Sequence, residues 1–137
     1  MPIGPLQLGL AAYALVAFVA LGCLLGVVAL GYWVLSDAKS RGRRSPWFDA
    51  TLTVAFVPYL LLYRYWRGER TSPPTSGELA ARDWTAVVFS AVLTGAMFSP
   101  PDPAMQLLWA APVMVGGGLL VGYRHRARTG GGDDALR

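Results

Sequence analysis

Residues 1–35 read MPIGPLQLGLAAYALVAFVALGCLLGVVALGYWVL, and none of these side chains carries a charge. Residues 84–123 form a second apolar run, in which Asp102 is the only charged residue. Both runs exceed the ~20 apolar residues with which a helix crosses the hydrocarbon core of a bilayer. The whole chain has 137 residues, 54% hydrophobic and only 15% charged, which is too few charges for the surface of a small soluble domain. The sequence therefore predicts an integral membrane protein.

Prolines and polar stretches divide the chain into apolar segments, which cover residues 6–35, 47–66, 84–99 and 104–123. The last two segments meet at Ser99–Pro103, where three prolines prevent a helix from continuing. Thr75 and Glu78 have the spacing of a capping box, which predicts that the third helix begins just after Thr75. We predict an all-α fold, an integral membrane bundle of four transmembrane helices in two hairpins. This single domain covers residues 1–128, and the glycine-rich residues 129–137 are predicted to be a disordered tail.

The second segment has two interpretations, because Pro58 lies in its middle. If residues 47–66 cross the bilayer, both termini are cytoplasmic, and the twelve Lys and Arg residues divide into eight inside and four outside. If the segment turns back at Pro58, all twelve lie inside and the N-terminus lies outside. Four spans are the prediction, since re-entrant backbone must be covered by protein and a small bundle offers little cover. The C-terminus is cytoplasmic in both cases.

Small residues recur on one face of the first and the fourth segment. Gly22, Gly26 and Ala29 lie three or four positions apart, and Gly118 and Gly122 repeat this spacing near the other end of the chain. In lipid, small residues let two helices approach closely, and close packing is a main source of helix association there. The pattern indicates either packing inside the bundle or a docking face for another membrane subunit.

A charged loop follows the first segment at the predicted membrane interface, and its members are Asp37, Lys39, Arg41, Arg43, Arg44 and Asp49. Because the two carboxylates have four cationic neighbours, we expect local ion pairs. Asp49 also suits the first turn of the second helix, where a negative charge meets the positive end of the dipole. A role in proton or ion coupling is the alternative, although no carboxylate lies near the middle of an apolar segment.

Few side chains are available for catalysis or for binding a cofactor. The chain has one cysteine, Cys23, and one histidine, His125, whereas metal and haem sites need several converging ligands. No nucleophile motif and no phosphate-binding glycine loop is present. We therefore predict no catalytic residue, no metal site, no cofactor and no enzymatic activity.

The net charge of +4 indicates membrane anchoring and not nucleic-acid binding, because the basic residues flank the apolar segments. These residues can also attract anionic lipid headgroups. The expected partners are thus the lipid bilayer and either a membrane protein or a second copy of the chain.

One part of the sequence carries a family resemblance. Residues 32–42 read YWVLSDAKSRG, and Pro46–Trp47, Pro58 and Tyr63–Arg64 follow. Over residues 29–67 this pattern resembles the two-helix membrane module at the N-terminus of cardiolipin-synthase-type phospholipase D proteins, and it is also similar to small multi-pass membrane proteins of prokaryotes. The glycine that usually follows the proline in that module is absent here, as is the catalytic His-x-Lys motif. The resemblance therefore implies an antiparallel helix pair that anchors or binds a partner, without phospholipase activity.

Together these features favour a non-catalytic accessory or assembly subunit of a larger complex in the plasma membrane of a prokaryote. The alternative is a small homo-oligomeric channel or transporter, with a path lined by the hydroxyl groups of Thr51, Thr53, Ser90 and Thr94.

Overall fold

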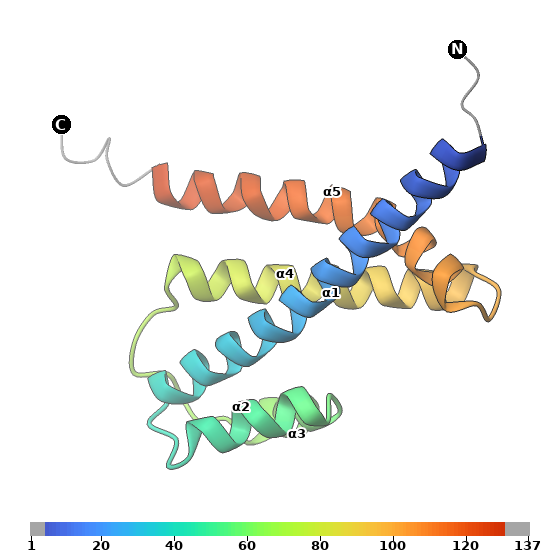
Figure 1. The fold of residues 1–137 in the computed structure, drawn as a ribbon. Coiled ribbons are helices and arrows are strands. Elements are labelled where there is room, and N and C mark those ends of the chain that lie inside the picture. Colours follow the sequence, from blue (N-terminus) through green and yellow to red (C-terminus); the bar gives the residue numbers. More distant parts are fainter. Residues whose placement is uncertain (1–4, 131–137) are drawn as a thin grey trace.

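The computed structural model describes residues 5–130, which form five helices joined by short loops (Figure 1). The helices are α1 (Pro5–Ser40), α2 (Pro46–Ala55), α3 (Tyr59–Trp66), α4 (Ser76–Phe98) and α5 (Pro103–Gly130). No strand occurs within this range, so the all-α prediction is confirmed for the described residues. Of the predicted disordered tail, Thr129 and Gly130 belong to α5, and the remainder lies outside the described residues.

Helices α4 and α5 pack side by side in antiparallel orientation, and α1 crosses them obliquely (Figure 1). The turn between α4 and α5 falls at the predicted Ser99–Pro103 break. Asp102 starts α5 by accepting hydrogen bonds from the backbone N–H groups of Ala104 and Met105, at 3.3 and 3.4 Å. Where α1 crosses the pair, a small core forms from Val19, Ala91, Ala110, Ala111 and Met114.

Residues 47–66 do not form one spanning helix. The chain breaks at Phe56–Pro58 into α2 and α3, which fold back on each other as a hairpin against α1 (Figure 1). Pro58 has no N–H to donate, so a continuous helix would lose a backbone hydrogen bond there. After the hairpin, the N–H of Thr71 donates to the carbonyl of Ser40 at 2.9 Å. Both ends of the hairpin therefore lie at the C-terminal end of α1, as in the re-entrant alternative.

The prediction of four spans overestimates the number of suitable helices. Two described helices, α1 and α5, are long and apolar enough to cross a membrane. At about 1.5 Å per residue, the ten residues of α2 reach only about 15 Å. The hairpin packs on α1 through a small core, in which Ala50 of α2 and Tyr63 of α3 are buried together with Leu30 and Val34.

The first helix is longer than predicted, because it continues through the first part of the charged loop to Ser40. Gly42 then ends it with a backbone φ of 62°, a left-handed conformation that suits glycine. The N–H of Gly42 bonds to the carbonyl of Lys39 and that of Arg43 to the carbonyl of Ala38, both at 3.1 Å, as in a Schellman motif. Asp37 and Lys39 are consequently helical and do not lie in a loop.

The predicted capping box is confirmed at the start of α4. The hydroxyl of Thr75 accepts from the N–H of Glu78 at 3.2 Å, and the carboxylate of Glu78 accepts from the N–H of Thr75 at 2.9 Å. Two backbone donors that the first helical turn leaves free are satisfied in this way.

Replacing Thr75 with alanine removes one of these bonds, and we expect the free energy of unfolding to fall by about 1 kcal/mol. The change can be measured in detergent micelles from the fluorescence of the five tryptophans during denaturation. Ser72→Ala in the same loop is the matched control, because no hydrogen bond of the Ser72 hydroxyl occurs among the described residues. Equal losses in both variants would contradict the assigned cap.

Candidate functional site

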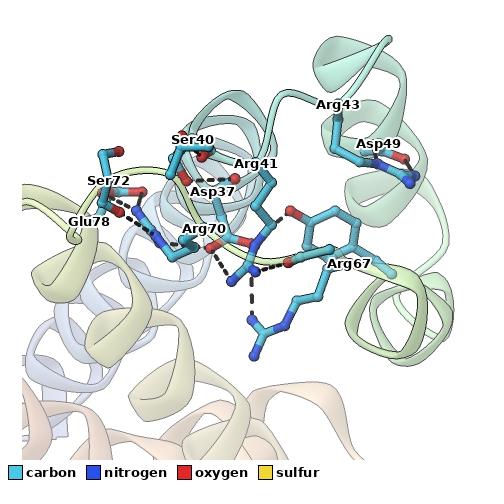
Figure 2. Close-up of polar contacts among 12 residues, drawn as sticks. Asp37, Ser40, Arg41, Arg43, Asp49, Arg67, Arg70, Ser72 and Glu78 are labelled. Carbon is cyan, nitrogen blue, oxygen red and sulfur yellow. Dashed lines mark hydrogen bonds and ion pairs between the residues drawn. The ribbon is translucent and has the colours of Figure 1, made fainter.

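The polar centre of the molecule is Asp37, on the last turn of α1, whose side chain is only 2% exposed. Arg41, one helical turn later, donates to both carboxylate oxygens at 2.8 and 3.1 Å. The phenol of Tyr63 in α3 donates to Asp37 at 2.8 Å, and Arg70 from the loop before α4 donates at 2.7 Å (Figure 2). Arg67 approaches the same carboxylate at 4.0 Å. One buried carboxylate thus binds groups from three different segments.

Arg70 connects this centre to α4. Its second terminal nitrogen contacts both carboxylate oxygens of Glu78, at 3.1 and 3.2 Å, and its Nε donates to the carbonyl of Ser72 at 3.0 Å. Arg41 also donates to the carbonyl of Gly68. We call Asp37, Arg41, Tyr63, Arg70 and Glu78 the Asp37 network. It joins α1, α3 and α4 at one end of the bundle (Figure 2).

Asp49, in the first turn of α2, forms a second and smaller ion-pair site (Figure 2). Arg43 donates to both of its carboxylate oxygens, at 2.9 and 3.1 Å, and the phenol of Tyr59 donates at 2.7 Å. The hydrogen bond from Arg43 lowers the pKa of Asp49 below its ordinary value; burial acts against this, and the bond from Tyr59 adds to it. The site fastens the start of α3 to the start of α2.

The lowered pKa of Asp49 predicts a pH dependence of stability. A carboxylate with a lowered folded-state pKa contributes stability above its unfolded pKa, about 3.9, and this contribution disappears as the pH falls through the folded value. We expect wild type to exceed Asp49→Asn by about 2 kcal/mol in unfolding free energy above pH 5, and the difference to shrink below pH 4. The unfolding free energies of wild type and Asp49→Asn are measured in detergent across this pH range. A difference that is constant down to pH 2 would contradict the prediction.

An open cavity of about 190 Å³ adjoins the Asp37 network. Five arginines line it, namely Arg41, Arg64, Arg67, Arg70 and Arg82. They face two carboxylates, Asp37 and Glu78, so the cavity has an excess of positive charge. We call it the arginine pocket. Guanidinium groups in a partly enclosed pocket are suited to binding an anion, above all a phosphate or a carboxylate.

The six predicted residues of the charged loop separate into different roles. Asp37 and Arg41 enter one ion-pair site, and Arg43 and Asp49 enter the other. The ammonium of Lys39 lies 5.5 Å from the ring centre of Trp47, within the range of a cation–π contact. Arg44 is exposed and makes no ion pair within residues 5–130.

Sequence reasoning missed the partners that come from farther along the chain, namely Tyr59, Tyr63, Arg70 and Glu78. Tyr59 and Tyr63 could have been identified as a pair from the sequence. They are four residues apart, which places both phenols on one face of a helix.

The predicted packing residues face the chain's own side chains to different degrees. A Cβ added to Gly26 would lie 2.7 Å from Val88 Cγ2, and one added to Gly118 would lie 3.2 Å from the ring of Trp84. A Cβ added to Gly22 would clash with the side chain of Met114. Ala29 is half-buried, and a Cβ on Gly122 would meet nothing within 4 Å.

Two close helix contacts were missed, at Gly95 against the backbone of Gln106 and at Gly117 against Val87. Both positions bring α4 and α5 together.

Of the four hydroxyl groups proposed to line a path, those of Thr53 and Thr94 bond within their own helices. Thr53 is fully buried and donates to the carbonyl of Asp49 at 2.7 Å, and Thr94 donates to the carbonyl of Ser90 at 2.8 Å. Each of these two hydroxyls thus bonds to its own helix, and Thr51 is exposed.

Within the described residues, no three His, Cys, Asp or Glu side chains are grouped so that they could bind a metal ion. No family model, no curated protein and no solved structure matches the chain.

Proposed function

We propose that this chain is a non-catalytic multi-pass protein of a prokaryotic plasma membrane that acts as an accessory or assembly subunit of a larger membrane complex. The observation that carries the proposal is a long apolar helix, α1, whose first part, before Val19, extends beyond the bundle (Figure 1). The ionisable side chains of the Asp37 network support it further, because they are engaged in ion pairs that hold helices together.

Exposure of the apolar helices supports a membrane environment. In the most apolar 18-residue windows of α1 and α5, only 22% and 17% of residues are buried. The core helix of a soluble protein has the same composition but is mostly buried. Large side chains such as Tyr13, Leu24 and Leu119 are more than 60% exposed. Contact of such an apolar surface with water is energetically unfavourable. A lipid environment removes this cost.

The connections of α4 indicate that it crosses the membrane together with α5. Its C-terminal end joins α5 through a short turn, and near its other end Asp83 accepts from Arg128 of α5 at 3.0 Å. Although α4 is not apolar enough to be a span by composition alone, we infer that it crosses the bilayer alongside the antiparallel α5. The proposed topology therefore has three crossings, by α1, α4 and α5, with the α2–α3 hairpin entering and leaving on one side.

This topology places all the described basic residues on one side of the membrane. They lie after α1, around the hairpin, near the start of α4 and at the end of α5. The α4–α5 turn, in contrast, contains no basic residue, and Asp102 is its only charged residue. The positive-inside rule then places these residues and the C-terminus in the cytoplasm, and the N-terminus outside.

The part of α1 before Val19 is the surface we assign to a partner. The helix has 36 residues and a length of about 54 Å, against about 30 Å of hydrocarbon core. From residue 9 onward its first buried side chain is Val19, and before that Leu10, Tyr13 and Phe18 are each about half exposed or more. The α-helical backbone is satisfied internally, so a neighbouring transmembrane helix can pack directly on this face.

The test is photo-crosslinking in the native host. A photoreactive phenylalanine analogue replaces Tyr13, and in a second strain it replaces Tyr65 on the hairpin. Both tyrosines are strongly exposed, at 78% and 83%. We expect crosslinks to one membrane protein at Tyr13 and not at Tyr65, and we expect this protein to co-purify stoichiometrically in mild detergent.

Other crosslinking results would support a different function. Crosslinks between two copies of this chain would favour the homo-oligomeric channel or transporter, for which flux into liposomes is the next measurement. No protein crosslink at either position, together with a monomeric purified protein, would contradict the accessory-subunit proposal.

A further inference from the structure

Two cavities are both lined by residues of α1 and α4, and we refer to the space between these two helices as the crevice. One is the arginine pocket, and the other, of about 210 Å³, is lined almost entirely by apolar side chains of α1, α2 and α4. On α1, Trp33 of the arginine pocket is three residues from Leu30 of the apolar cavity, and on α4, Arg82 is three residues from Thr85. Three residues advance a helix by about 4.5 Å, so on both helices the polar lining and the apolar lining lie about one turn apart.

Three guanidinium groups of the arginine pocket have N–H donors to spare. The other two are engaged in the Asp37 network. Within residues 5–130, Arg64 makes no hydrogen bond or ion pair, and Arg67 only approaches Asp37 at 4.0 Å. Arg82 makes one bond, of 3.4 Å, to its neighbour Asp83. These three arginines come from α3, from the loop after it and from α4, so they approach the pocket from different segments.

We propose that the crevice binds one anionic phospholipid, with its phosphate held by Arg64, Arg67 and Arg82 and an acyl chain in the apolar cavity. The planar guanidinium group matches the oxygen geometry of a phosphate. In the proposed topology the arginine pocket lies at the cytoplasmic face, where anionic headgroups are concentrated. A free phosphate ion would satisfy the arginines but would leave the apolar cavity without a ligand. The two cavities together therefore point to the lipid.

The test measures lipid binding to the full chain in a neutral detergent. Dioleoyl phosphatidylglycerol, dioleoyl phosphatidylcholine and inorganic phosphate are titrated separately and detected by native mass spectrometry. We expect phosphatidylglycerol to bind about tenfold or more tightly than phosphatidylcholine, and inorganic phosphate to compete only weakly.

The arginines are tested with a triple variant, R64Q/R67Q/R82Q. Each basic residue near the headgroups contributes about fivefold in affinity, so we expect phosphatidylglycerol binding to weaken by roughly 100-fold. R44Q/R124Q/R126Q is the matched control, because it removes the same charge from exposed positions outside the pocket. We expect this control to weaken binding less than about fivefold. If the first triple variant fails to fold, Arg64→Gln alone, with an expected loss of about fivefold, replaces it.

Three results would overturn the proposal. Equal losses in the two triple variants would show general charge attraction and no specific site. Equal affinity for the two lipids would show that the headgroup charge is not recognised. Binding of inorganic phosphate that is as tight as that of phosphatidylglycerol would reassign the pocket to a free anion.

Discussion

Replacing Asp37 with alanine should lower the free energy of unfolding by about 3 to 5 kcal/mol, the largest loss that we expect from a single substitution in this chain. The carboxylate is 2% exposed and accepts hydrogen bonds from Arg41, Tyr63 and Arg70. Without it, two guanidinium groups at a partly buried site lose their main counter-charge. Because the same carboxylate joins α1 to α3 and to the loop before α4, the hairpin should loosen first. Tryptophan fluorescence during denaturation in detergent measures the loss.

Two further variants separate this effect from a general loss of charge. Asp83→Ala also removes a carboxylate with two arginine partners, at 3.4 and 3.0 Å, but these arginines are 51% and 31% exposed. We expect it to cost less than about 1 kcal/mol. Tyr63→Phe removes one hydrogen bond to a charged group and should cost about 1.5 to 3 kcal/mol. If Asp37→Ala cost no more than Asp83→Ala, the Asp37 network would not hold the hairpin in place.

The second large effect is expected at Gly95, where α4 lies directly against the backbone of α5. A Cβ added here would clash with the backbone carbonyl oxygen of Gln106 and would lie 3.2 Å from its carbonyl carbon. A backbone atom cannot rotate away as the end of a side chain can, so the two helices must separate. We expect Gly95→Ala to lower the free energy of unfolding by about 1 to 3 kcal/mol, and Gly95→Leu by more.

Gly122→Ala is the matched control for Gly95→Ala. It makes the same change in helix propensity within α5, and its added Cβ meets nothing within 4 Å. We expect it to leave stability unchanged or slightly raised. Unfolding of both variants in the same detergent tests the pair, and a loss at Gly122 equal to that at Gly95 would mean that close packing at Gly95 is not the cause.

Much of the local structure could be predicted from neighbouring residues. The two apolar runs predicted the long apolar helices, Thr75 and Glu78 predicted the start of α4, and the prolines at 100, 101 and 103 predicted its end. Each of these signals depends on residues within a few positions of one another. The end of α1 was placed too early because the charged residues after position 35 looked like a loop. The i,i+4 pair of Asp37 with Arg41 and the glycine at position 42 instead prolong the helix and then stop it.

The path of residues 47–66 could not be predicted in this way. Pro58 was compatible both with a kinked spanning helix and with a return to the same side. The observed return is held by bonds between residues far apart in the sequence, from Tyr63 to Asp37 over 26 positions and from Arg70 to Asp37 over 33. No local periodicity shows which of many arginines will reach one carboxylate.

By itself, then, the sequence determined that the described residues are helical and that apolar segments are followed by basic residues, because hydropathy, proline and capping act over a few residues. Only the tertiary structure decided that the second segment is a hairpin, that Asp37 is buried at the centre of a network, and that arginines from several segments share one pocket. Those features depend on long-range charge pairing and on the packing of the hairpin against α1. Such contacts exist only once the helices have packed.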